Sequence, residues 1–108
     1  MADYEDISAR HDGAIARIAV ERPGRLNAYR DQTADELRDA LRRAEDDPAI
    51  RVAVFTGAGR AFGSGYDLST LAPGDVPELD RVLEEHFNPL VREMRASRLP
   101  IVAQVNGP

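Results

Sequence analysis

A glycine-rich segment that directly follows an apolar run constrains this chain more than any other feature. The run 52–55 has the length and branched side chains of a buried strand, and residues 56–68 then hold four glycines, at positions 57, 59, 63 and 65. Glycine permits positive φ angles and a close approach of a ligand to the backbone. The segment has no histidine, cysteine or lysine, and its only carboxylate is Asp67. Its chemistry is most simply that of exposed backbone N–H groups, which predicts an anion or oxyanion site.

Composition excludes several classes of protein. The 108 residues suit a single domain or a piece of one, and 43% of them are hydrophobic. The net charge is −5, and all 14 basic residues are arginines interleaved with acids, which argues against a nucleic-acid groove. The absence of cysteine excludes disulfides and thiolate metal sites. Residues 1–6 are acidic, and no apolar run approaches the ~18 residues of a membrane span, so we expect a soluble, cytoplasmic protein without a membrane partner.

Strand and helix patterns alternate along the chain and predict an α/β fold. Branched residues bounded by turn signals predict a first strand over 14–20. Thr33 and Glu36 have the spacing of a capping box at the start of a helix over 33–46. Residues 72–75 form a turn-rich spacer, and an apolar stripe over 79–94 predicts a long helix packed along one face. Pro89 either bends this helix or follows a cap at Asn88, and a last strand is expected over 101–105.

Four ordered blocks of the sequence resemble the N-terminal half of the enoyl-CoA hydratase/isomerase (crotonase) family. The resemblance implies a crotonase-like superhelix of ββα units, of which residues 1–108 would be the N-terminal part of one domain, truncated at its C-terminal end. Three further segments resemble the ring-epoxide isomerase type of phenylacetyl-CoA breakdown. The four blocks are 18–28, 47–52, 56–68 and 100–107, and the three segments are 67–69, 72–77 and 86–92.

The resemblance implies binding of an acyl-CoA thioester, whose enolate oxygen is stabilised by two backbone N–H groups. One of these donors would be the backbone of Tyr66, whose side chain would help to shape the acyl pocket. The second donor and the acid/base carboxylates would lie beyond Pro108, so the chain alone is expected to be inactive. No metal and no cofactor other than the CoA of the substrate are expected, and the complete protein would be a homotrimer or hexamer. The substrate- and CoA-binding positions would be Arg25, Leu26, Ala28, Ser64, Gly65, Tyr66, Asp67 and Leu68.

Other interpretations stay open. Arg25 is either a solvated loop charge or a phosphate contact, and the Ala28 backbone would lie near the adenine. Asp67 is interpreted as structural, His86 as a packed or half-buried core residue, and His11 as no ligand. Competing functions are a 2-enoyl-CoA hydratase, a non-catalytic crotonase-like packing module, and a nicotinamide-binding domain. The last one fits a loosened glycine fingerprint over 57–63, but no helical pattern follows that loop directly.

Overall fold

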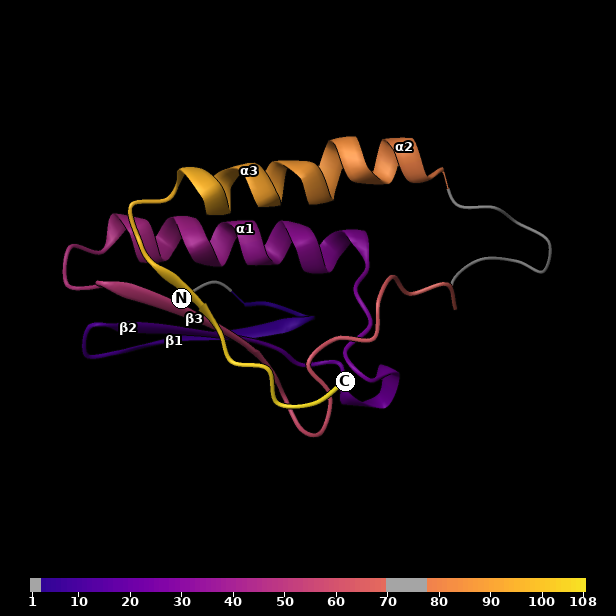
Figure 1. Cartoon of the computed structure of the whole chain (residues 1–108), viewed down its shortest axis with the longest axis horizontal. Helices are drawn as coiled ribbons and strands as arrows, with labels where there is room; N and C mark the ends of the chain where they lie inside the picture. Colours follow the sequence, from indigo (N-terminus) through magenta and orange to yellow (C-terminus); the bar gives the residue numbers. More distant parts are fainter. Residues whose placement is uncertain (1–2, 70–77) are drawn as a thin grey trace.

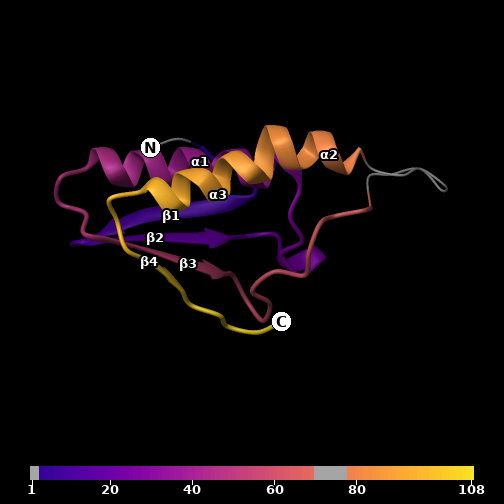
Figure 2. The same cartoon turned by 45° about the horizontal axis from the view of Figure 1, so that its top comes forward.

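A computed structural model describes residues 3–69 and 78–108, and in this part of the chain a four-stranded sheet carries the helices on one face (Figures 1 and 2). The strand order is β1-β2-β3-β4. The elements are β1 (Ile7–Asp12), β2 (Ile15–Val20), the 3-10 turn η1 (Pro23–Arg25), α1 (Asp31–Asp46), β3 (Val52–Gly57), α2 (Leu79–Val82), the π-helical η2 (Leu83–Phe87), α3 (Asn88–Ala96) and β4 (Ile101–Ala103).

Strand β1 was not expected from the sequence. It pairs antiparallel with β2 along its full length, from Ile7 opposite Val20 to Asp12 opposite Ile15. Gly13 makes the tight connection with φ at +60°, a conformation that costs glycine little. The first predicted strand, 14–20, corresponds to β2. The Asp12-Gly13 pair that bounds the predicted strand is also a hairpin signal.

Strands β2, β3 and β4 are parallel neighbours, and α1 makes the crossover from β2 to β3. The helix buries a stripe of mostly small residues at helical spacing against the sheet. Alanines on this stripe let α1 approach β2 closely, where Ala16 and Ile18 are buried. The stripe consists of Ala34, Leu37, Ala40, Leu41 and Ala44.

The capping-box prediction for α1 is wrong. The helix begins at Asp31, with Arg30 at the N-cap position. Thr33 is therefore its third residue, where its hydroxyl accepts the backbone N–H of Arg30 at 3.1 Å and donates to Asp6 at 2.6 Å. Glu36 accepts the backbone N–H groups of Glu5 and Asp6, at 3.1 and 2.8 Å. Both residues tie α1 to the segment before β1, and Thr33 also caps the helix, as its third residue rather than as its N-cap.

Pro89 does not follow a capping asparagine, and it lies where a π-helical turn interrupts the second helical region. Asn88 has helical dihedral angles, and its N–H donates to the carbonyl of Leu83, five residues earlier. The widened turn η2 leads into α3, with Pro89 in the first turn of that helix. Proline cannot donate a ladder hydrogen bond and crowds the preceding turn, and a π turn accommodates both effects.

The apolar stripe over 79–94 is only partly buried, which differs from the expected packing along one face. Leu90 is buried against the core, whereas Leu79, Leu83 and Val91 are about half exposed. The last strand ends at Ala103 instead of residue 105, although the Gln104 N–H still donates to the Phe55 carbonyl at 2.8 Å. The predicted spacer over 72–75 lies outside the described residues.

Candidate functional site

The glycine loop after β3 is held by two asparagine side chains from other segments. Asn27 is fully buried, and its Nδ2 donates to the carbonyls of Ala58 and Ala61, at 2.9 and 2.7 Å. Asn106 donates to the Gly59 carbonyl at 2.8 Å and accepts the Gly57 N–H at 3.2 Å. A loop whose carbonyls are fixed in this way presents its N–H groups in a defined geometry.

Two of the loop glycines are required by close contacts, and a third by its backbone angle. A Cβ atom on Gly57 would lie 2.2 Å from the Ala61 carbonyl oxygen, and one on Gly63 would lie 2.6 Å from the hydroxyl of Tyr29. Gly65 has φ at +104° with open space where a Cβ would stand. Residues other than glycine avoid this φ. The conformation of Gly65 therefore sets the direction of the peptide that leads into Tyr66.

Tyr66 is anchored on both sides by Tyr29. The Tyr29 N–H donates to the Gly65 carbonyl at 2.8 Å, and the Asp67 N–H donates to the Tyr29 carbonyl at 2.7 Å. These bonds form a parallel bridge between Tyr29 and Tyr66. Among residues 3–69 and 78–108, the N–H of Tyr66 itself has no acceptor. The arrangement leaves one oriented backbone donor at the residue that the sequence singled out.

An apolar cavity of about 270 Å³ is lined in part by Tyr66. The loop side of its wall is formed by Gly65, Tyr66 and Tyr29, and the helical side by side chains of α2 and η2. The rings of Tyr66 and Phe87 meet edge to face, with centroids 6.0 Å apart. The residues from the helical side are Leu79, Val82, Leu83 and Phe87. None of these helical residues was predicted as a site residue, because their spacing reads equally well as core.

A second cavity of about 340 Å³ lies on the other part of the loop. It is lined by Leu26, Arg60, Ala61, Ser64 and Pro108, so two predicted residues, Leu26 and Ser64, meet there. The Ser64 hydroxyl donates to the Arg25 carbonyl at 3.3 Å. Arg60 was not predicted; its position within the glycine loop is the signal that could have identified it.

Arg25 and Ala28 occupy the turn that leads into α1. The side chain of Arg25 is exposed and forms no ion pair with any residue that the structure describes. Ala28 is buried, its N–H donates to the Arg25 carbonyl at 3.0 Å, and its carbonyl accepts Nη1 of Arg22 at 2.6 Å. A carbonyl has a second lone pair, so the Ala28 oxygen keeps the capacity for one more donor.

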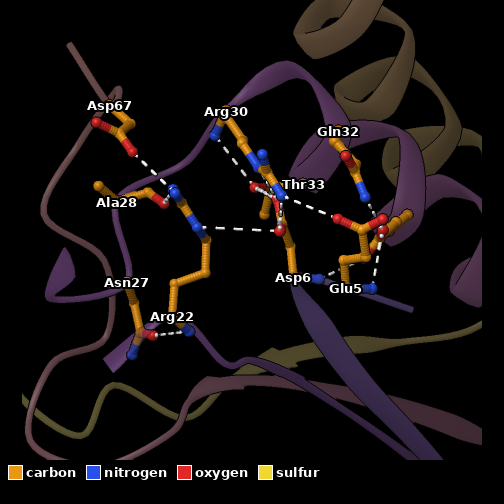
Figure 3. A network of polar contacts seen from close by, with 10 residues as sticks. Glu5, Asp6, Arg22, Asn27, Ala28, Arg30, Gln32, Thr33 and Asp67 are labelled. Carbon is orange, nitrogen blue, oxygen red and sulfur yellow. Dashed lines mark hydrogen bonds and ion pairs between the residues drawn. The ribbon is translucent and has the colours of Figure 1, made fainter. Parts of the chain in front are cut away.

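A network of buried charges fixes this turn relative to the loop (Figure 3). Arg22 lies at its centre: Nη2 is 2.9 Å from Oδ2 of Asp67, an ion pair without the alignment of a hydrogen bond, and Nε is 3.9 Å from Oδ1 of Asp6. The backbone N–H of Arg22 donates to Oδ1 of Asn27 at 2.7 Å. One arginine thus connects β2, the turn before α1, and the residue that follows Tyr66.

Asp6 and Arg30 complete the network. Nε and Nη2, on one edge of the Arg30 guanidinium, donate to the two oxygens of the Asp6 carboxylate, at 2.7 and 2.6 Å. Burial alone would raise the pKa of Asp6, but the hydrogen bonds from Arg30 and Thr33 together with nearby Arg22 hold that pKa below its ordinary value. The network therefore contains two carboxylates, Asp6 and Asp67, that stay ionised around Arg22 and Arg30.

Asp67 faces this network. Its Oδ1 accepts the Ser69 N–H at 2.8 Å. Hydrogen bonds from Ser69 are the main cause that lowers the pKa of Asp67 to about 2, and the nearby guanidinium of Arg22 contributes less. An ionised carboxylate occupied by these partners is a weak proton acceptor, which suits a structural role. Leu68 is 58% exposed beside it.

The two histidines contact carboxylates. His86 is half-buried, but it contacts Asp35 at 2.8 Å and Asp31 at 3.5 Å rather than a purely apolar core. His11 lies in β1, with Nδ1 2.9 Å from Asp47. In the described residues no cluster of three or more histidine, cysteine or acidic side chains is arranged to hold a metal ion. No helix in the same part of the chain is long and apolar enough to cross a membrane.

Comparisons with known proteins identify the family. Residues 10–108 match the family model described as enoyl-CoA hydratase/isomerase, so the chain belongs to that family. The 1,2-epoxyphenylacetyl-CoA isomerase of Escherichia coli is 35% identical over 106 residues, which are 95% of this chain and 40% of that protein. A probable enoyl-CoA hydratase of Mycobacterium tuberculosis, EchA14, is 39% identical over 108 residues, covering 99% of this chain and 41% of that protein.

Solved structures show the same fold. An enoyl-CoA hydratase/isomerase from Xanthobacter autotrophicus Py2 superimposes with a TM-score of 0.86 at 30% identity, covering 98% of this chain and 40% of that one. The expected crotonase-like α/β fold is confirmed, and the nicotinamide-binding alternative is wrong. In the described part of the loop, residues 58–69, no helix opens after β3 to receive a pyrophosphate. The chain spans about two fifths of the length of the curated relatives that it matches.

Proposed function

We propose that this chain binds an acyl-CoA thioester and contributes one backbone donor of an oxyanion hole for enolate chemistry. The observation that carries the proposal is the N–H of Tyr66, which has no acceptor among the described residues and belongs to a residue that lines the apolar cavity. A donor fixed before the reaction stabilises developing charge without reorganisation, and removal of one such donor costs about 3 kcal/mol of transition-state stabilisation in other enzymes.

The thioester carbonyl would accept from the Tyr66 N–H, with the acyl group in the 270 Å³ cavity and CoA running along the second cavity. Leu26 and Ser64 line that second cavity, and the free lone pair of the Ala28 carbonyl suits an adenine amino group. Arg25 and Arg60 are two exposed cations near this path. Either one could meet a CoA phosphate, and substitution of each in turn distinguishes them.

We assign no general acid or base within this chain. Asp67 is engaged by Ser69 and Arg22. The second N–H donor and the acid/base carboxylates are proposed to come from residues beyond Pro108, as the family resemblance implies. Neither a metal nor a redox cofactor is required, because fixed dipoles and carboxylate proton transfer suffice for hydration or isomerisation.

Among reactions of this type, isomerisation of a ring epoxide of phenylacetyl-CoA is favoured. Tyr29, Tyr66 and Phe87 surround the cavity with rings, and aromatic edges and faces suit a ring-bearing acyl group. One relative of similar identity is named a 1,2-epoxyphenylacetyl-CoA isomerase. Hydration of a 2-enoyl-CoA is the alternative, supported by relatives named probable enoyl-CoA hydratases.

The proposal is tested by distorting the loop at Gly65. Gly65→Ala and Gly65→Val force a side chain into φ +104°, whereas Gly13→Ala places the same kind of strain, at φ +60°, in the distant β1–β2 turn. Neither position has a heavy atom within 4 Å of the added Cβ. We expect acyl-CoA binding to weaken at least tenfold in the Gly65 variants and to stay unchanged in Gly13→Ala. Equal binding in all of them would contradict the oxyanion assignment.

A further inference from the structure

The hydroxyl of Tyr66 does not enter the apolar cavity. It donates to Oδ1 of Asp31, the first residue of α1, at 2.9 Å. Burial raises the pKa of the Tyr66 phenol, and the hydrogen bond to Asp31 raises it further, so the phenol stays protonated and able to donate at neutral pH. The polar atom of Tyr66 is therefore turned away, and the ring is left as part of an otherwise apolar wall.

The same carboxylate also lies near the helix that forms the opposite wall. Oδ2 of Asp31 is 3.5 Å from Nε2 of His86, which belongs to the π-helical turn η2. The other ring nitrogen of His86 lies 2.8 Å from Asp35, one helical turn further along α1. Figure 1 shows this end of the second helical region above the start of α1. Asp31 thus has contacts to both sides of the cavity, through Tyr66 and through His86.

We propose that Tyr66 is a specificity-determining residue that selects compact, ring-bearing acyl groups, and that Asp31 is the positioning residue that holds its ring in place. Three observations support this. The Tyr66 ring packs edge to face on Phe87. Its hydroxyl has a single acceptor among the described residues, Asp31. The cavity of about 270 Å³ is lined by three aromatic rings, those of Tyr29, Tyr66 and Phe87.

The physical reason is that a fixed ring gives a cavity a fixed shape. A tyrosine without its acceptor can change its χ1 rotamer more readily, and its ring then yields to flexible straight chains. With the hydroxyl tethered, a flat ring fits against the wall that Tyr66 and Phe87 form together, while a longer chain must displace one of them. The inference rests on the proposed acyl-CoA function, but the tether itself is a property of the free protein.

The test compares variants that keep the fold and remove the tether. Tyr66→Phe keeps the ring and removes the hydroxyl, and Asp31→Asn weakens the acceptor. Asp35→Asn is the matched control, because Asp35 contacts His86 but not Tyr66. Dissociation constants for phenylacetyl-CoA, decanoyl-CoA and free CoA are measured for each variant and for the double variant Tyr66→Phe/Asp31→Asn. Thermal unfolding confirms that each variant is folded.

The dissociation constant of decanoyl-CoA divided by that of phenylacetyl-CoA measures the selectivity for a ring. We expect this ratio to fall about fivefold in Tyr66→Phe and in Asp31→Asn. Affinity for free CoA and the ratio in Asp35→Asn should stay as in the wild type. The double variant should match Tyr66→Phe alone, since Asp31 acts through Tyr66. An unchanged ratio in both single variants, or additive effects in the double variant, would overturn the inference.

A readout without ligand separates this inference from the proposed function. The NMR couplings that report χ1 of Tyr66 should show one rotamer in the wild type and Asp35→Asn and averaging over rotamers in Asp31→Asn. If the tether is observed and the wild type binds no acyl-CoA, the proposed function is contradicted. The proposed selectivity is then contradicted as well. If acyl-CoA binds and all variants select alike, only the inference about Tyr66 and Asp31 fails.

Discussion

The guanidinium of Arg22 lies 2.9 Å from the carboxylate of Asp67, although 45 positions separate the two residues in the chain. The side chain of Arg22 is 14% exposed and that of Asp67 is 5% exposed. This pair joins the end of β2 to the residue that follows the proposed oxyanion donor. The position of the Tyr66 N–H therefore depends on Arg22, a residue outside both the glycine loop and the apolar cavity.

Replacement of Arg22 by Met should be costly, because it leaves Asp6 and Asp67 buried without their shared cation. Removing one partner of a buried pair typically costs about 3–5 kcal/mol. We expect the free energy of unfolding to fall by about 3 kcal/mol in urea titrations. Arg17→Met is the control, since Arg17 is partly exposed and 3.8 Å from the exposed Asp12; its effect should be below about 1 kcal/mol. Similar losses in both variants would contradict a special role of Arg22.

The free energy of unfolding should decrease at acidic pH because Asp67 becomes protonated. Its folded-state pKa of about 2 lies below the ordinary value of about 3.9. The ionised form is thus favoured by folding, and its contribution of roughly 2 kcal/mol is present above pH 4 and lost as the pH falls towards 2. The slope of unfolding free energy against pH in this window should decrease in Asp67→Asn and persist in Asp12→Asn. The same slope in all three proteins would show that Asp67 does not contribute.

Asn27 should tolerate even a nearly isosteric change poorly. Its Nδ2 donates to two loop carbonyls, and its φ is +56°. Asp fits this backbone angle but places a carboxylate oxygen against those carbonyls. We expect Asn27→Asp to lower the unfolding free energy by about 3 kcal/mol and to weaken acyl-CoA binding. Asn88→Asp, in a helix of the described chain, is the control, and equal stability of the two variants would refute this role of Asn27.

Two arginines compete for the proposed phosphate contact, and substitution decides between them. Arg60 lines the second cavity, while Arg25 stands in the neighbouring turn beside Leu26. The Ala variant of the residue that meets the phosphate should weaken binding of CoA and of acyl-CoA by the same factor, about threefold to tenfold. A remote contact of this kind is made equally in ground and transition states. If neither variant binds more weakly, no phosphate contact exists at either position.

The sequence predicted the parts of the fold that are encoded locally. The apolar run of β3 and the glycines after it are neighbours in the chain, so their pattern alone indicated a strand followed by a loop. The stripe on α1 likewise repeats at helical spacing, which fixed its buried face. The pattern misplaces the first residue of α1, because Thr33 bonds to the N-cap residue Arg30 as the third residue of the helix and to the distant Asp6, instead of being the N-cap itself.

The remaining features depend on partners that are distant in the sequence. In the sequence, Asn27 has the pattern of an ordinary turn residue. Its role follows only from the fold, in which its side chain donates to two loop carbonyls 31 and 34 positions later. Strand β1 was missed because ISARHD carries few apolar residues, and it is held mainly by pairing with β2. Of the two proposed cavities, the sequence indicated the loop residues but not Leu79 or Phe87, because an apolar helical stripe has the same pattern whether it packs in a core or lines a cavity.

The backbone amide of Tyr66 gives the most direct test of the central claim. In a ¹⁵N-labelled protein titrated with phenylacetyl-CoA, the Tyr66 amide proton should move downfield as it bonds to the thioester oxygen. Titration with free CoA, which has no thioester carbonyl, should shift residues around Leu26 and Ser64 and leave Tyr66 in place. If phenylacetyl-CoA binds and the Tyr66 amide does not move, or if free CoA moves it equally, this N–H is not an oxyanion donor.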